Sequence, residues 1–312
     1  MSDTSLRDAR VFVTGAAGFL GREVLRRLAA AGADVHAIRF RAEHPADRVT
    51  WHQADLLDAV RLRTVLSAVR PEIVFHLAAY GARPGEHDRD RMIAVNVQGS
   101  LNLWSALPDT VRRMVMAGTC AEYACADGPV NERYPCDPRS VYAASKHAAV
   151  TLLRAFARED RRALVMLRPF GPYGPGDDSD RVIPFTIRRL VAGETVPLSA
   201  GEQLCDFAFV DDHARAFVLA ATAALPELAA VYNVGSGRPM VLRSVVEAAA
   251  DAVGRGARSR LQFGALPYRD GESGAVCADI TAARRDLGYE PAVSLEEGLA
   301  RTVRWIRALV QA

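Results

Sequence analysis

Paired cysteines, a signal core and long apolar runs are all missing from the sequence. Its five cysteines form no C-x-x-C pair, and their number is odd. The polar start MSDTSLRDAR carries no apolar signal core, and no apolar run approaches the ~20 residues of a membrane span. We therefore expect free thiols, a reducing, cytoplasmic location and no membrane partner.

The sequence also lacks a large excess of positive or negative charge. The 312 residues carry a net charge of +2, which gives no general reason to expect a nucleic-acid partner. No internal repeat or low-complexity tract breaks the pattern. Half of the residues are hydrophobic and 24% are charged, as in an ordinary soluble globular protein that can bury a large core.

Short apolar runs alternate with helical patterns in the first half of the sequence. The runs are typical of buried strands and lie at 10–15, 34–39, 72–79, 112–118 and 163–169. Helical patterns separate them, from Phe19 to Ala31, Ala59 to Val69, Arg89 to Leu107 and Ser140 to Arg158. This alternation predicts an α/β fold, with a parallel sheet covered by helices on both faces.

The pattern changes after Arg168. Proline and glycine cluster in RPFGPYGPGDD, and the remaining sequence is mixed. Two later segments, 207–224 and 229–237, can return to the sheet as a helix and a further strand. We therefore predict two lobes with an interrupted boundary and a substrate cleft between them.

A glycine-rich loop follows the first predicted strand. It reads TGAAGFLG, with Gly15, Gly18 and Gly21, and it opens the first predicted helix at Phe19 and Leu20. Such a loop gives a tight turn, a bare backbone against a pyrophosphate and a helix N-terminus directed at negative charge. Glycines also occur in ordinary turns, but the strand before and the helix after favour dinucleotide binding.

The second predicted strand ends in a positive charge, where an acidic residue usually binds the adenine ribose of NAD. Arg39 stands near this point and Arg41 follows it. An arginine offers a planar fork of donors to a 2′-phosphate, which favours NADP; a solvated strand end, with NAD use, is the alternative. Further on, Asp55 is expected either to accept a hydrogen bond from adenine or to cap the next helix.

Tyr142 and Lys146 lie four residues apart in VYAASKHAAV, so they share one face of a helix. A lysine beside a phenol favours the phenolate and lowers its pKa from about 10. The tyrosine can then exchange a proton with a sugar hydroxyl near neutral pH. The pair alone is common on solvated helices, and the glycine loop upstream gives it weight.

In combination these motifs resemble the extended short-chain dehydrogenases/reductases that act as nucleotide-sugar epimerases, dehydratases and ketoreductases. The resemblance covers nearly the whole chain and includes HLAA at 76–79, Asn96 in NVQGS, Thr119 in GTCAEY, LRPFGPYGPG and CDFAFVDD. It implies a Rossmann NAD(P)-binding domain at 1–168 plus about 206–235. A smaller C-terminal lobe, at about 169–205 plus 236–312, would bind a nucleoside diphosphate sugar.

The resemblance also assigns roles to residues. Tyr142 takes the place of the acid/base, Lys146 would grip the nicotinamide ribose, and Thr119 would hydrogen-bond the reacting oxygen. The residues expected to bind the cofactor are Gly15, Gly18, Phe19, Leu20, Gly21, Arg39, Arg41, Asp55, Leu56, Leu77, Ala78, Ala79, Tyr142 and Lys146. Those expected to bind substrate are Tyr80, Thr119, Cys120, Arg181 and Arg269; no metal site is expected because no cluster shows ligand spacing.

Several positions depart from the family pattern. Cys120 and Ala121 replace the Asp-Glu pair that eliminates water in the dehydratases, which argues against dehydration. Cys120 is either a catalytic thiol or a small buried residue. Cys205 replaces the arginine that binds the pyrophosphate, and Gly171 replaces a frequent asparagine. Arg269 still matches a family arginine, and Arg181 or Arg188 can compensate for the arginine lost at 205.

Other residues are expected to be structural. Asn96 would fix helix geometry near the site, Asp211 or Asp212 would cap the following helix, and His213 would serve the fold. By resemblance, the helices at 89–107 and 140–158 pair two subunits into a homodimer. The second helix would offer a small apolar surface formed by Ala143, Ala144, Ala148, Ala149 and Val150.

These observations predict an NADPH-dependent reductase that acts on the 4-keto group of a nucleotide-activated 6-deoxysugar. A 4-epimerase with tightly bound NAD would use the same residues and is the alternative. A non-catalytic NADP sensor on the same fold is a third possibility, but a sensor has no need of the Tyr142 and Lys146 pair. NADP(H) is the preferred cofactor, with NAD(H) as the other choice.

Overall fold

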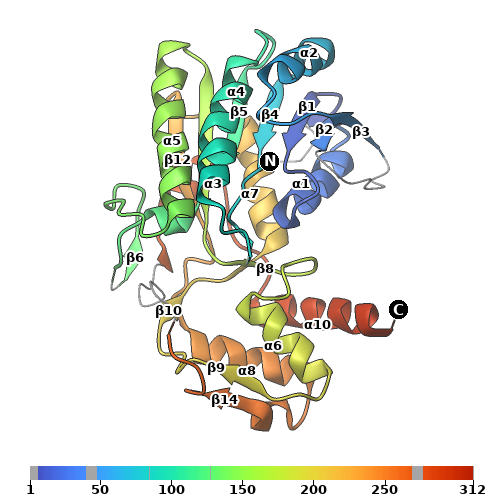
Figure 1. Ribbon diagram of the computed structural model, residues 1–312, viewed down its shortest axis with the longest axis vertical. Coiled ribbons are helices and arrows are strands. Elements are labelled where there is room, and N and C mark those ends of the chain that lie inside the picture. The colour runs from blue at the N-terminus through green and yellow to red at the C-terminus, as the bar shows by residue number, and fades with distance from the viewer. Residues whose placement is uncertain (1–5, 40–47, 84, 127, 269–276, 312) are drawn as a thin grey trace.

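The computed structural model describes residues 6–39, 48–83, 85–126, 128–268 and 277–311 (Figure 1). Seven parallel strands form one sheet in the order β12-β7-β5-β4-β1-β2-β3, which confirms the predicted doubly wound α/β fold. The strands are β1 (Arg10–Thr14), β2 (Asp34–Arg39), β3 (Val49–Gln53), β4 (Ile73–His76), β5 (Arg113–Ala117), β7 (Ala163–Pro169) and β12 (Ala229–Val234).

Both faces of the sheet are buried, because alternate residues of a strand enter separate cores. In β1, Val11 and Val13 pack into one core and Phe12 into the other, and all three are fully buried. Helices α1 (Phe19–Ala30) and α7 (Val210–Thr222) supply the first core. Helices α2 (Ala59–Val69), α4 (Gly99–Ser105) and α5 (Val141–Glu159) supply the second.

The helix predicted at 89–107 consists of three consecutive pieces. These are α3 (Arg89–Ile93), a π-helical segment η2 (Ala94–Gln98) and α4. Asn96 lies in the π-helical segment and is buried, where its amide bonds the backbone N–H and C=O of Tyr80 and the hydroxyl of Ser145. Asn96 therefore fixes the start of the loop after β4 against α5, in keeping with the structural role predicted for it.

A smaller set of elements lies below the sheet in Figure 1 and has its own apolar cores. Helices α6 (Val182–Val191), α8 (Leu242–Val253) and α10 (Leu295–Gln311) pack there with the parallel pair β9 (Val196–Leu198) and β14 (Leu261–Phe263). The remaining elements are β6 (Pro129–Val130), η3 (Cys120–Glu122), β8 (Pro172–Tyr173), β10 (Leu204–Cys205), β11 (Ala208–Phe209), β13 (Met240–Val241), η4 (Ala257–Arg260), β15 (Cys277–Ala278) and α9 (Thr281–Leu287). The exact division of the chain into two domains remains a prediction.

Two buried carboxylates join the segments where the chain passes between the sheet and the smaller part. Asp206 accepts hydrogen bonds from the backbone N–H groups of Ser236, Gly237 and Ala278, at 2.7, 3.1 and 3.1 Å. Asp212 accepts from the backbone of Ala292 and Val293 at 2.9 and 3.0 Å, just before α10 begins. Each carboxylate therefore accepts hydrogen bonds from backbone N–H groups that would otherwise lack a partner.

The predicted capping role of Asp211 or Asp212 is wrong. Helix α7 begins after Phe209, and no side chain caps it. Asp212 binds the segment before α10, and Asp211 pairs with Arg27 at 2.7 Å to tie α7 to α1. His213 is fully buried between the carbonyl groups of Phe209 and Phe170, as the structural role predicted for it requires.

The outer face of α5 is smaller than the sequence suggested. Ala143, Ala149 and Val150 belong to the interior of the subunit, with at most 3% of each residue exposed. Ala144 points outward and is followed on the same side of the helix by the partly exposed Ala148 and by Leu152, which is 39% exposed. No helix in the described part of the chain is long and apolar enough to cross a bilayer.

Candidate functional site

The glycine loop connects β1 to α1 and leaves no room for side chains. Gly15 has a φ of +69°, and a Cβ atom there would lie 2.4 Å from the backbone nitrogen of Ala78. A Cβ atom on Gly21 would lie 2.1 Å from the carbonyl oxygen of Gly15. Gly18 is the N-cap of α1 and offers no side chain to its first turn. The first N–H groups of the helix, at Phe19 and Leu20, are therefore available to an anion.

A chain of buried hydrogen bonds holds the ends of β1 and β4 beside this loop. His76 lies 2.7 Å from the hydroxyl of Thr14 through Nδ1 and 2.8 Å from the hydroxyl of Ser100 through Nε2. Burial lowers the pKa of His76 to about 3, so the ring is neutral. The Thr14 hydroxyl also accepts from the backbone of Ala78 at 3.3 Å, which positions Leu77, Ala78 and Ala79 against the glycine loop.

Thr119, Tyr142 and Lys146 come together between the end of β5 and the start of α5. Ser140 caps α5 by accepting from the backbone of Ala143 at 3.1 Å, which sets the first turn that carries Tyr142. The Thr119 side chain lies close enough to Tyr142 to lower the pKa of its phenol. The Thr119 Oγ1 accepts from the backbone N–H of Ala121 at 3.3 Å. The hydroxyl that accepts this bond still has one proton to donate to an oxygen beside it.

Lys146 is the only lysine in the chain, and it is 1% exposed. Its Nζ is buried with no hydrogen-bond partner among the residues that the structure describes. Burial lowers the pKa of Lys146 to about 8, against the opposing effect of the Glu122 carboxylate. An unpartnered buried ammonium is costly, so this atom fits a ligand that brings hydroxyl groups to it.

The pKa of Tyr142 differs from the expectation. Burial raises the pKa of this phenol to about 12, while the Arg181 guanidinium and the Thr119 hydrogen bond lower it. Lys146 is not among the largest causes of this shift, although the two residues lie one turn apart. The predicted lowering by Lys146 is therefore not met, because burial of the phenol has the larger effect.

Arg39 ends β2 and is partly exposed. Its side chain has no ion-pair or hydrogen-bond partner within the described ranges. Arg41 lies outside the described residues. Asp55 accepts from the backbone of Leu57 at 3.0 Å but does not cap α2; Asp58 does so, accepting from Arg61 at 2.9 Å. The capping alternative for Asp55 is therefore wrong, and its predicted contact with adenine stays a prediction.

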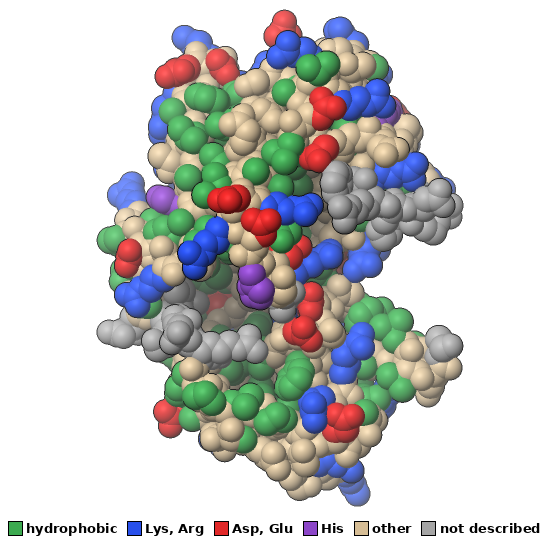
Figure 2. All heavy atoms as spheres, viewed as in Figure 1, with side chains coloured by type: hydrophobic (Ala, Val, Ile, Leu, Met, Phe, Trp, Pro, Cys, Tyr) green, Lys and Arg blue, Asp and Glu red, His purple; other side chains and the backbone are tan. Residues whose placement is uncertain are grey.

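On the substrate side, Arg181 stands at the start of α6 and reaches the loop after β4. Its Nη2 donates to the carbonyl oxygen of Ala82 at 3.1 Å, and its Nε lies 3.6 Å from the buried carboxylate of Asp177. The charge of Arg181 lowers the pKa values of both Tyr142 and Cys120. Figure 2 shows the surface recessed between the upper and lower parts of the molecule. Arg269 lies outside the described residues.

Cys120 is poorly suited to act as a catalytic thiolate. Burial raises the pKa of its thiol to about 11, and the thiol contacts the backbone of Gly171. The residue is partly exposed, and its raised pKa argues against the first of the two alternatives from the sequence, the catalytic thiol. Tyr80 lies in the loop that follows β4, where the Arg91 guanidinium is 4.9 Å from the centre of its ring.

The departures at Gly171 and Cys205 have structural counterparts. Gly171 has a φ of +41°, and a Cβ atom there would lie 2.2 Å from the carbonyl oxygen of Asp206, so no asparagine fits this backbone. The Cys205 thiol donates to the carbonyl oxygen of Met240 at 3.1 Å, and burial raises its pKa to about 12. A neutral thiol therefore stands where a pyrophosphate-binding arginine was expected.

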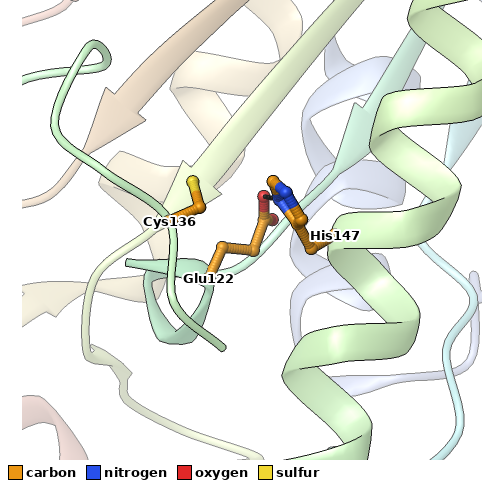
Figure 3. A group of neighbouring side chains, drawn as sticks. All are labelled: Glu122, Cys136 and His147. Atoms are coloured by element: carbon orange, nitrogen blue, oxygen red, sulfur yellow. Dashed lines mark hydrogen bonds and ion pairs between the residues drawn. The ribbon is translucent and has the colours of Figure 1, made fainter. Parts of the chain in front are cut away.

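A buried carboxylate next to Thr119 escaped the sequence analysis. Glu122 is fully buried; its Oε2 pairs with Arg168 at 2.9 Å and lies 3.3 Å from the Nδ1 of His147. Figure 3 shows Glu122 and His147 directed at one another, with Cys136 beside them. The three could surround a metal ion, but Arg168 also donates to the Cys136 thiol at 3.3 Å. The Arg168 guanidinium therefore already supplies the positive charge that a metal ion would bring to these three residues.

Comparisons with known proteins identify the family of the chain. A model of the NAD-dependent epimerase/dehydratase family matches residues 11–235. The chain is 32% identical to a UDP-glucose 4-epimerase of Mycolicibacterium smegmatis, over 96% of this chain and 98% of the relative. It is 29% identical to a dTDP-glucose 4,6-dehydratase of Neisseria gonorrhoeae, over 95% and 94%. The structure of MoeE5 in complex with UDP-glucose and NAD has a TM-score of 0.86, with 32% identity over 97% of this chain and 100% of MoeE5.

The fold, the glycine loop and the Thr119, Tyr142 and Lys146 group therefore define a dinucleotide-dependent enzyme of the extended short-chain dehydrogenase/reductase type. The chain belongs to the NAD-dependent epimerase/dehydratase family. The bare glycine loop and the unpartnered Lys146 Nζ fit a nicotinamide dinucleotide, which supplies or accepts the hydride when bound.

Proposed function

We propose that the protein is an NADPH-dependent reductase of the 4-keto group of a nucleotide-activated 6-deoxysugar. The observation that carries the proposal is Arg39, a partly exposed arginine at the end of β2, where an NAD enzyme places an acid. A reductase consumes reduced cofactor at every turnover, which NADPH suits. An epimerase recycles a bound cofactor and gains nothing from the NADPH pool.

The protein's own groups suit the delivery of a proton to a carbonyl oxygen. A phenol with a pKa of about 12 is protonated at neutral pH, so Tyr142 starts the reaction as an acid. Its proton would pass to the sugar O4 as hydride reaches C4. The Thr119 hydroxyl would donate a hydrogen bond to the same oxygen, and the Lys146 ammonium would hold the hydroxyls of the nicotinamide ribose.

Dehydration finds no support in the residues near Thr119. Cys120 and Ala121 occupy the positions of the dehydratase Asp-Glu pair. The nearest carboxylate along the chain, that of Glu122, is hydrogen-bonded to Arg168 and His147. Burial alone would raise the pKa of Glu122, but these two partners hold it below its ordinary value. Glu122 is therefore a fixed anion and not a proton donor to substrate.

The test is stoichiometric. Purified protein is incubated with a thymidine-diphosphate 4-keto-6-deoxyhexose, and reduced nicotinamide absorbance is followed with NADPH and with NADH. We expect one NADPH consumed per sugar reduced, with NADH much slower. Equal rates with the two cofactors would remove the assigned role of Arg39, and no consumption with a panel of 4-keto sugar nucleotides would contradict the reductase.

A nucleotide-sugar 4-epimerase is the second candidate, and some of the relatives support it. The UDP-glucose 4-epimerase of M. smegmatis matches nearly the full chain, and MoeE5 was solved with UDP-glucose and NAD. The same three residues would then move a proton from O4 and back. Interconversion of two unoxidised sugar nucleotides without added cofactor would put this activity first, and Arg39 would then be a solvated strand end.

We also propose that two copies of the chain associate through α5 and the segment from α3 to α4. Ala144 and Leu152 lie on the outward side of α5, and Ile93 at the end of α3 is 53% exposed. Replacing Leu152 with Arg should then shift the protein towards the monomer in light scattering after gel filtration. An unchanged mass for that variant would place the interface elsewhere.

A further inference from the structure

We propose that Glu122 is the positioning residue of this active site: its carboxylate fixes the backbone at Thr119, ties it to α5 through His147, and presents a negative charge to Lys146. The proposal rests on the roles proposed above for Thr119, Tyr142 and Lys146. Glu122 itself touches neither substrate nor cofactor in this scheme. It acts through the residues that do.

The first contact is with the backbone of Thr119. The Oε1 of Glu122 accepts the Thr119 N–H at 2.9 Å, while the Thr119 hydroxyl accepts the N–H of Ala121, so the two ends of η3 cap one another. Gly118 makes room for this arrangement, since a Cβ atom there would lie 2.8 Å from the same Oε1. The carboxylate therefore sets the direction in which the Thr119 hydroxyl points.

The second contact joins this turn to the helix that carries Tyr142 and Lys146. The Nδ1–H of His147 donates to the Oε2 of Glu122 at 3.3 Å, and His147 directly follows Lys146 in α5. Figure 3 shows the two side chains meeting between η3 and α5. One carboxylate thus spans the two elements whose separation determines whether Thr119 and Tyr142 can reach one oxygen.

The third effect is electrostatic. Glu122 raises the pKa of Lys146, against the larger lowering by burial, and His76 is the other titratable group coupled to this lysine. Arg168 balances the carboxylate from β7, with Nε and Nη2 at 3.1 and 2.9 Å from Oε2. If Glu122 and Arg168 formed a purely structural ion pair, it would only hold Arg168 in the core. Removing the charge of Glu122 would then leave Thr119 and Lys146 unaffected.

Glu122→Gln tests this, because it keeps the shape and one acceptor but removes the charge. Asp212→Asn is the matched control: Asp212 is a buried carboxylate with two backbone donors and an arginine partner, Arg215, remote from Thr119. We expect kcat to fall about 10²-fold in Glu122→Gln with KM little changed. Asp212→Asn should lower thermal stability and leave kcat as in the wild type. A folded Glu122→Gln protein with wild-type kcat would reduce Glu122 to a structural role.

The link to α5 has its own pair of variants, which serve if Glu122→Gln fails to fold. His147 is partly exposed, so its replacement should be tolerated. His147→Gln keeps a donor for Glu122 and should retain most of kcat, whereas His147→Leu removes the donor and should lose it. Equal activity in the two variants would overturn the link.

A readout without substrate separates this proposal from the proposed function. Because Lys146 is the only lysine, 13C labelling of lysine Cε gives one resonance whose pH titration reports one pKa. We expect a lower pKa in Glu122→Gln and no change in Asp212→Asn. This result would support the positioning role even if no nucleotide sugar is turned over. An identical titration in wild type and Glu122→Gln would contradict it whatever the substrate.

Discussion

Arg181, at the start of α6 in the smaller part of the molecule, donates a hydrogen bond to the carbonyl oxygen of Ala82 in the loop after β4, at 3.1 Å. The same guanidinium lies near Asp177 and acts on the phenol of Tyr142. It is thus a positive charge held across the recess between the two parts. With Cys205 in place of the family's arginine, Arg181 is the residue we expect to bind the pyrophosphate of the substrate.

Replacing Arg181 with Met should therefore weaken substrate binding. We expect KM for the nucleotide sugar to rise about tenfold or more, as for the loss of a charge-assisted hydrogen bond. The matched control is Arg188→Met, which removes an exposed arginine from the same helix. Steady-state kinetics of both variants give the two KM values for comparison. A larger effect at Arg188 would place the pyrophosphate there.

Replacing Arg39 with Asp should reverse the cofactor preference. The carboxylate would repel a 2′-phosphate and accept hydrogen bonds from a 2′-hydroxyl, so kcat/KM for NADPH should fall about 10-fold to 100-fold and that for NADH should rise. Arg63→Asp makes the same change of charge at an exposed position of α2 and should leave the ratio unchanged. A parallel loss with both cofactors in Arg39→Asp would show that Arg39 does not read the 2′ position.

Replacing Tyr142 with Phe should remove the proton donor and leave the cofactor site intact. We expect kcat to fall about 10²- to 10⁴-fold, the usual contribution of a positioned acid. The thermal stabilisation by bound cofactor should remain. Tyr134→Phe is the control, since its hydroxyl bonds the carbonyl oxygen of Cys125 outside the proposed reaction centre. Near-normal turnover in Tyr142→Phe would exclude the mechanism.

Replacing Lys146 with Met should stabilise the cofactor-free protein while weakening cofactor binding. Burial lowers the pKa of Lys146 from 10.5 to about 8, so its charged form opposes folding below pH 8 by about 3 kcal/mol. The cost decreases as the pH rises from 8 and is gone above 10.5, because the lysine is then neutral in the folded and unfolded states. Urea unfolding at pH 7 and pH 10.5 should show an advantage for Lys146→Met that is large at the first pH and small at the second. Equal stability at pH 7 would mean that the ammonium finds a partner.

The local parts of the fold and site were predictable from the sequence. The TGAAGFLG loop carries its strand, its turn and its helix within one segment, and the spacing of Tyr142 and Lys146 is set by a single helix. Each signal needs only neighbours along the chain. The observed strands and helices accordingly lie close to the apolar runs and periodic segments that predicted them.

The parts that depend on distant residues were not predictable. Glu122 and Arg168 are 46 residues apart, and nothing in either segment indicates that they pair. Asp212 was predicted to cap a helix because it stands near a helix start, yet its carboxylate accepts a hydrogen bond from the backbone N–H of Ala292, 80 residues later. The pKa of Tyr142 was misjudged for the same reason, since burial by the whole fold has a larger effect than one neighbouring lysine.

The arrangement of Asp206 has a mechanical consequence. The chain passes between the sheet and the smaller part near Gly171, at Asp206 and after Gly235, and the Asp206 carboxylate or its backbone contacts these segments and Ala278. A hinge made of independent strands of chain would bend at several places. Here the described crossings meet at one buried carboxylate, so we expect any change in the angle between the two parts to be centred on Asp206. A substitution at Asp206 should therefore disturb several of these crossings at once, which the loss of any single backbone contact would not do.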